Sequence, residues 1–191
     1  MRRAFSALVL LFATVLAFGQ DAADVGSNSA SQAAADLLRE YAGADGAFIA
    51  AGLINKTFDK DNLASLIQYP TDEVVVVNLT GSEVRQALER SVSLYPLPNP
   101  SFLQLSGIEA TFSKGASIGQ RIVNVTVGGV KLDDKRTYAI AMPASLAQGG
   151  SGYFKIWDSS KIAKTFKNVT VASVLKGKHA ADTSPRWSVV G

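Results

Sequence analysis

The chain contains no cysteine and a single histidine, His179, among its 191 residues. The absence of cysteine excludes disulfides, iron–sulfur clusters and thiolate zinc sites. Because there is only one imidazole, a metal centre that needs two or more histidines cannot be assembled within this chain. We therefore expect no metal and no other cofactor.

An excess of charge of one sign is also missing. The chain has 19 Lys and Arg against 16 Asp and Glu, and Arg2 and Arg3 account for two of the positive charges. No basic stripe with interleaved aromatic residues is present, so we expect no nucleic-acid partner. The length and the hydrophobic fraction of 47% suit one domain with its own core.

The N-terminus carries the pattern of an export signal. Arg2 and Arg3 precede an apolar stretch over residues 4–18, and small residues occupy positions 17 and 19. This pattern predicts a signal peptide over residues 1–19, cleaved before Gln20. We expect an exported protein, periplasmic or secreted, with no membrane contact after cleavage. An uncleaved N-terminal anchor is the alternative, although the apolar stretch is shorter than the roughly 20 residues of a spanning helix. Residues 20–31 are small and polar, and we expect a disordered lead-in there.

Residues 32–191 are predicted to form one α+β domain, a mixed β-sheet layer structure with packed helices, because helical and strand patterns alternate without a strict rhythm. Apolar residues at helical spacing predict helices over Gln32–Tyr41 and Val169–Lys176, and a helical turn over Leu63–Ile67 capped by Asp59 or Asp61. The expected strands are Ala47–Ala51, Glu73–Leu79, Ile108–Phe112, Ile122–Val127, Thr137–Met142 and Arg186–Val190.

Three local signals are stronger than the others. Thr80 and Glu83 have the spacing of a capping box and predict the start of a helix. Gly128-Gly129 lies between two alternating segments and predicts a hairpin turn. Ala139 and Ala141 alternate with larger residues in the strand 137–142, so that strand has a small face on which a helix can pack closely.

Other candidate sites are weaker. His179 lies in a segment rich in Lys, Gly and Ala, where a catalytic base would not be held in place, so we interpret it as a solvated histidine. Asp133 and Asp134 follow the hairpin and precede Lys135-Arg136, which is typical of a turn. The run Gly149-Gly150-Ser151-Gly152 fits two interpretations: a plain flexible turn, or a loop whose backbone approaches a ligand closely.

The order of the motifs resembles a known family. In sequence, they are a Gly-containing turn after residues 47–51, Leu79-Thr80-Gly81 opening a helix, Phe102–Gly107, Arg121-Ile122-Val123, Gly129–Asp133 leading to Thr137-Tyr138, and Leu146–Tyr153. Together they resemble the C-terminal domain of the 5′-nucleotidase, UDP-sugar hydrolase and 2′,3′-cyclic-nucleotide phosphodiesterase family, over roughly residues 32–157.

The resemblance implies that hydrolysis and substrate binding belong to different domains. In that family an N-terminal metallophosphoesterase domain holds two metals and performs the hydrolysis, while the C-terminal domain holds the base and the ribose. This chain has no room for the first domain and lacks its histidines. We therefore expect a substrate-recognition domain that stands alone and has no catalytic residues of its own.

The family's substrate contacts are only partly present. By the resemblance, the Asn and Arg of a substrate-binding turn fall on Ala50 and Asn55, the first stacking Phe falls on Tyr69, the second falls on Ser145, and the ribose-binding Asp falls on Ser151. The degenerate substrate-binding set implied by the resemblance is Asn55, Tyr69, Ser145, Gly149, Gly150, Ser151 and Tyr153.

Three functions remain open from the sequence. The first is a non-catalytic exported module that binds an altered, nucleotide-like small ligand or a protein partner. The second is the substrate-binding half of a split 5′-nucleotidase in nucleotide catabolism, completed by a separate metallophosphoesterase subunit. The third is a structural or surface-interaction domain.

Overall fold

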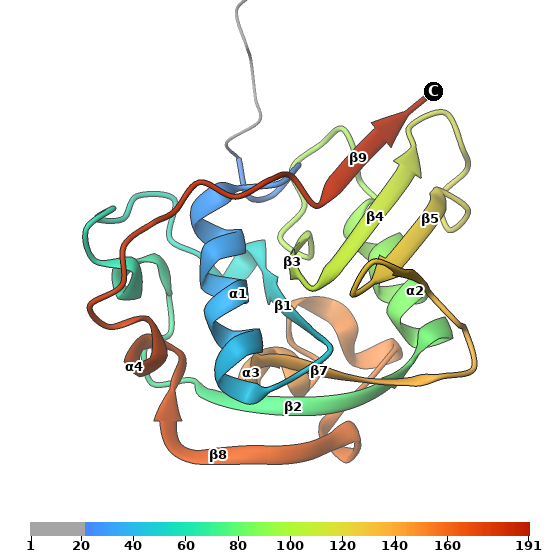
Figure 1. Cartoon of the computed structure of the whole chain (residues 1–191). Helices are drawn as coiled ribbons and strands as arrows, with labels where there is room; N and C mark the ends of the chain where they lie inside the picture. Colours follow the sequence, from blue (N-terminus) through green and yellow to red (C-terminus); the bar gives the residue numbers. More distant parts are fainter. Residues whose placement is uncertain (1–21) are drawn as a thin grey trace, which may run out of the picture.

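A computed structural model of the chain describes residues 22–191, and their strands form two sheets (Figure 1). The strand order is β3-β1-β7-β2-β8 in the five-stranded sheet and β6-β5-β4-β9 in the four-stranded sheet. The strands are β1 (Gly46–Ala50), β2 (Glu73–Thr80), β3 (Leu103–Ser106), β4 (Ile108–Ser113), β5 (Ile122–Val127), β6 (Val130–Lys131), β7 (Thr137–Pro143), β8 (Ile162–Thr170) and β9 (Trp187–Val190).

The helices are short except for two. The α-helices are α1 (Ser29–Ala42), α2 (Gly81–Ser91), α3 (Ala144–Ala147) and α4 (Val171–Leu175), and the 3-10 helices are η1 (Ala51–Leu53), η2 (Leu63–Leu66), η3 (Gly150–Lys155) and η4 (Ser159–Lys161). This arrangement is the expected α+β class. Within residues 22–191, no helix combines the length and the hydropathy needed to cross a bilayer.

The five-stranded sheet is buried on both faces. Ala47 and Ile49 of β1 belong to a core shared with α1, η2 and α4, whereas Phe48 between them belongs to a core shared with α2 and the four-stranded sheet. The β-branched run of β2 is suited to this position because its side chains pack on both sides of the pleat. This central sheet is the scaffold whose edge holds the candidate site.

The strongest local predictions are confirmed. Thr80 accepts a hydrogen bond from the backbone of Glu83 (3.2 Å), and the Glu83 carboxylate accepts one from the backbone of Thr80 (2.8 Å). The Gly128-Gly129 turn joins β5 to β6, and both glycines have positive φ. Ala141, on the small face of β7, packs in the same core as α1.

The predicted disordered lead-in is wrong for residues 22–31, the part that the structure describes. The buried side chain of Gln104 donates hydrogen bonds to the carbonyls of Ala23 and Gly26 and accepts one from the backbone of Asn28. Helix α1 starts at Ser29 rather than at residue 32, because Asn28 caps it. Partners that lie about 80 positions along the chain order a segment whose own composition gives no sign of structure. The predicted signal peptide, its cleavage point and residues 20–21 lie outside the described residues.

Two strands and one cap differ from expectation. β3 and β8 were not predicted as strands, since β3 is buried on both faces and β8 is a mostly polar edge strand without alternation. The helical turn η2 has Asn62 at its N-terminal boundary, and no side chain caps it. Asp59 instead accepts a hydrogen bond from the backbone of Asp61, so neither carboxylate caps the turn as predicted.

Candidate functional site

Three loops that carry the implied binding residues meet at one edge of the five-stranded sheet. Strands β1 and β7 are parallel and end at this edge, and β2, antiparallel to β7, begins there. η1 follows β1, a turn over residues 69–72 precedes β2, and α3 with the glycine-rich loop follows β7. The loops are brought together because each adjoins the same end of neighbouring strands.

Ser145 and Asp72 join two of these loops. The backbone nitrogen of Ser145 donates to Oδ1 of Asp72 (3.0 Å), and its hydroxyl donates to Oδ2 (2.5 Å). The resemblance implies that Ser145 stands at the position of the family's second stacking Phe. Here the position is an anchor for the turn that contains Tyr69, and Asp72 is a residue of this edge that sequence reasoning missed.

Tyr69 is an aromatic side chain on the turn before β2 at this edge. Its side chain is about half exposed, with a relative exposure of 51%, and its carbonyl accepts a hydrogen bond from the backbone of Asp72 (3.1 Å). An exposed phenol ring on a turn fixed through Asp72 can stack on a flat, apolar ligand. Tyr69 is therefore available for the role that the resemblance implies.

The glycine-rich loop is a tightly packed turn. A Cβ on Gly150 would lie 2.5 Å from the carbonyl oxygen of Ser145, and a Cβ on Gly149 would lie 2.8 Å from the backbone of Phe154. Gly149 and Gly152 have φ of 90° and 77°. The sequence left two interpretations open, a flexible turn and a loop that approaches a ligand. In the structure the glycines are required for a different reason, because the loop backbone packs closely against other residues of the chain.

Ser151, the position that the resemblance assigns to the ribose-binding Asp, is held through its backbone. Its carbonyl accepts hydrogen bonds from Nη2 of Arg90 (3.0 Å) and from the Ser101 hydroxyl (2.7 Å), and its φ is 52°. The guanidinium of Arg90 forms no ion pair within residues 22–191, and its Nε is buried without a partner. The loop therefore packs against the positively charged guanidinium of Arg90.

Tyr153 is a core residue, which corrects its place in the implied binding set. It is fully buried, its ring stacks on Trp157 with centroids 4.5 Å apart, and its hydroxyl donates to the carbonyl of Ser101 (2.5 Å). Burial raises the pKa of this hydroxyl well above its ordinary value of 10.0. The neighbouring Phe154, which the sequence analysis passed over, is instead 66% exposed on the same loop.

Asn55 is also a structural residue. Its amide nitrogen donates to the carbonyls of Ser65 (2.9 Å) and Ile67 (3.3 Å), and its backbone nitrogen donates to Leu66 (2.8 Å). These bonds fasten the segment after η1 to η2 and use both amide hydrogens. The side chain is therefore not directed to a ligand, contrary to the implied role.

The remaining acidic and imidazole groups do not converge. Within the part of the chain that the structure describes, no three His, Cys, Asp or Glu side chains lie together in a way that would hold a metal ion. His179 is exposed and lies 3.8 Å from Asp61. Asp134 pairs with Arg85 (3.1 Å), and Asp133 lies in the turn before β7.

Comparison with known proteins identifies the family of this domain. A model of the family described as 5′-nucleotidase, C-terminal domain, matches residues 9–157 of the chain. A snake venom 5′-nucleotidase from Naja atra is 32% identical over 89 residues, which are 42% of this chain and 17% of that protein. A 5′-nucleotidase-related protein from Glossina morsitans morsitans is 29% identical over 128 residues, 60% of this chain and 23% of that protein.

A solved structure shares the fold. The crystal structure of a 5′-nucleotidase precursor from Thermus thermophilus superposes with a TM-score of 0.74 and 23% sequence identity, covering 90% of this chain and 37% of that chain. The resemblance inferred from the order of the motifs is thus confirmed. The chain spans a minor part of the length of each of these relatives, so the likeness defines a domain rather than a whole hydrolase.

Proposed function

Because this chain belongs to the 5′-nucleotidase C-terminal domain family, we propose that its domain is a ligand-recognition module that holds a nucleotide-like small molecule and does not hydrolyse it alone. The observation that carries the proposal is that Asp72 hydrogen-bonds both to the turn of the exposed Tyr69 and to Ser145, whose carbonyl lies against Gly150 of the Gly149–Gly152 loop. Tyr69 stacks on the flat part of the ligand, and the loops define the space beside it.

The ligand differs from that of the family because three contacts are replaced. Stacking a base on an aromatic ring is worth about 1–3 kcal/mol, and a hydrogen bond to a charged group about 1.5–3 kcal/mol. Loss of one stack at Ser145, one guanidinium at Asn55 and one carboxylate at Ser151 removes roughly 4–9 kcal/mol. A micromolar site for the family's substrate would become millimolar or weaker.

We expect no hydrolysis by the chain itself because it has too few metal-binding side chains. A dinuclear hydrolytic centre needs several imidazole and carboxylate ligands, and the chain supplies one histidine, exposed beside Asp61. Tyr153, a hydroxyl on the binding loop, is buried and engaged with Ser101. We expect no phosphatase activity from the purified chain with added manganese, and turnover in that assay would overturn this part of the proposal.

Thermal-shift titration tests the recognition part. We expect a weak, saturable rise in the unfolding temperature with at least one of adenosine, AMP, uridine and UDP-glucose, which the Tyr69→Ala variant abolishes. Tyr41→Ala is the matched control, since Tyr41 is similarly exposed (46%) but packs against Phe166, away from the loops of the site. No response to any of the four compounds, or loss of the response in the control alone, would sink the proposal.

A second candidate function is the substrate-binding half of a split enzyme. It is favoured by the small share of each relative that this chain matches, such as 37% of the Thermus thermophilus chain. In this case a separate metallophosphoesterase subunit supplies the metals. Nucleotidase activity that appears only when both chains are mixed, and that falls in Tyr69→Ala, would distinguish this role from the first. A partner-binding or structural role predicts no nucleoside effect in either experiment.

We also propose that the protein is exported to the periplasm or secreted. Support comes from the basic and apolar pattern of residues 2–18 and from the snake venom relative. Mass spectrometry of the protein from its native cells should show a mature N-terminus at Gln20. An intact Met1 would contradict it.

A further inference from the structure

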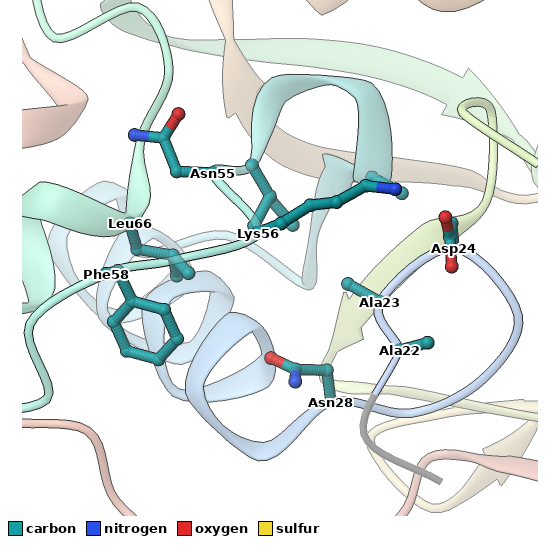
Figure 2. Close-up of a pocket in the computed structure, with 10 residues that line it drawn as sticks. Ala22, Ala23, Asp24, Asn28, Asn55, Lys56, Phe58 and Leu66 are labelled. Carbon is teal, nitrogen blue, oxygen red and sulfur yellow. The ribbon is translucent and has the colours of Figure 1, made fainter. Parts of the chain in front are cut away.

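A cavity lies between the N-terminal segment and the connection from η1 to η2, and Tyr69 is not among its lining residues. Its volume is about 370 Å³, within the range of small-molecule sites. Figure 2 shows its lining side chains. They are Ala22, Ala23, Asp24, Asn28, Ala51, Ile54, Asn55, Lys56, Phe58 and Leu66.

One end of the cavity carries two opposite charges. Figure 2 shows the Lys56 side chain extended along the cavity toward the end at which Asp24 stands. Within residues 22–191, neither side chain forms an ion pair or a hydrogen bond, and they do not pair with each other. Asp24 is half-buried and Lys56 is exposed, so both charges are open to a ligand.

The other end is apolar. Phe58 and Leu66 stand there, and Ile54 adds to the apolar lining. Leu66 is 1% exposed and Phe58 is half-buried against the same core, so these side chains are fixed by packing. The cavity therefore has a polar end with both signs of charge and an apolar end with an aromatic ring.

The walls are held in place by bonds from elsewhere in the fold. Gln104 fixes the backbone of the N-terminal segment at Ala23, Gly26 and Asn28, and the amide of Asn55 fastens the opposite wall to η2. A preformed cavity loses less conformational entropy when a ligand enters than a flexible one does. The site is thus built before any ligand arrives.

We propose that this cavity binds a small zwitterion with an apolar body, of the class of apolar α-amino acids. The ligand carboxylate meets the ammonium of Lys56, the ligand ammonium meets the carboxylate of Asp24, and the apolar side chain packs against Phe58 and Leu66. Neither Tyr69 nor the Gly149–Gly152 loop lines this cavity, so this proposal and the nucleotide-like ligand proposed at Tyr69 can each fail without the other.

NMR titration of the ¹⁵N-labelled chain tests the charge pattern with three probes that share one body: L-phenylalanine, 3-phenylpropionate and phenethylamine. We expect L-phenylalanine to bind about threefold to fivefold more tightly than either singly charged analogue, because each partly exposed ion pair adds a modest amount. The shifted backbone amides should be those of residues 22–28 and 54–58.

Variants assign each charge. Lys56→Gln should remove the advantage of L-phenylalanine over phenethylamine, and Asp24→Asn should remove its advantage over 3-phenylpropionate. Lys60→Gln is the matched control, since Lys60 is exposed nearby and does not line the cavity. Tyr69→Ala should leave all three affinities unchanged, which separates this site from the proposed nucleotide-like one. Equal affinities for the three probes, no binding, or affinities that ignore Lys56 and Asp24 would overturn the proposal.

Discussion

Ser145 donates two hydrogen bonds to the carboxylate of Asp72, at 3.0 Å from its backbone nitrogen and 2.5 Å from its hydroxyl. The pair ties the end of β7 to the turn before β2, 73 positions earlier in the chain. Ser145 therefore has a structural role, because this pair holds the turn that carries Tyr69 against the end of β7.

Ser145→Ala should lower the free energy of unfolding by about 1–2 kcal/mol, because the half-buried carboxylate of Asp72 loses a hydroxyl donor. Denaturant unfolding measures this, with Ser117→Ala, at an exposed loop position, as the control. Equal stability of the two variants would show that the hydrogen bond from the Ser145 hydroxyl to Asp72 does not contribute to the free energy of unfolding.

Ser151→Asp should strengthen nucleoside binding by restoring a ribose acceptor. Asp tolerates the positive φ of 52° at this position, and a hydrogen bond to a carboxylate is worth about 1.5–3 kcal/mol, a tenfold gain or more. The gain should appear for adenosine and not for 2′,3′-dideoxyadenosine in calorimetric titration. The same gain for both nucleosides would mean that the new carboxylate does not contact the ribose.

Gly152→Ala should destabilise the protein by at least about 2 kcal/mol more than Gly177→Ala, because displacing Arg90 disrupts its hydrogen bonds to Ser151 and Ser101. Both glycines have positive φ, but a Cβ on Gly152 would collide with the Arg90 guanidinium, whereas a Cβ on Gly177 meets open space. The paired variants share the backbone strain of an alanine at positive φ, so thermal unfolding isolates the collision. Similar losses in both would exclude the collision as a source of instability.

The contribution of Glu83 should depend on pH. Burial raises the pKa of this carboxyl, but hydrogen bonds from Lys161 and Thr80 and the charge of Lys161 outweigh burial, so its pKa lies below the ordinary value of 4.5. Since the folded-state pKa is lowered, the stabilisation is fully present above the unfolded-state pKa and is lost as pH falls through the folded-state value.

Glu83→Gln should therefore cost about 1–2 kcal/mol at pH 7, and the difference from the parent should shrink as the pH falls below the ordinary carboxyl pKa of 4.5. Unfolding curves between pH 3 and 7 measure it, with Glu109→Gln, exposed on β4, for comparison. A difference that stays constant down to pH 3 would contradict the charge argument.

Gln104→Ala should release the N-terminal segment. Three backbone groups of residues 23–28 lose their partner, and the variant leaves a cavity in the core, so we expect a loss of about 2–4 kcal/mol. Hydrogen exchange should accelerate first at Asn28, whose amide bonds to Gln104. Slow exchange at Asn28 in the variant would show that other contacts hold the segment.

The sequence determined the elements whose signals are local. The valine run of β2, the capping box at Thr80 and the Gly128-Gly129 turn each act within a few residues, and their order along the chain was enough to indicate the family. The resemblance to the family, which rests on the order of the motifs, also indicated that Tyr69 lies at the binding edge of the sheet.

Only the tertiary structure decided which side chains remain available to a ligand. The sequence suggested that Asn55 and Tyr153 bind a ligand, but their polar side-chain atoms hydrogen-bond to Ser65 and Ser101. It also suggested that residues 22–28 are disordered, but Gln104 hydrogen-bonds to this segment. In each case the deciding partner lies ten to about eighty positions away. Burial and hydrogen-bond satisfaction depend on which distant residues the fold brings together, and composition and spacing within a segment do not encode that.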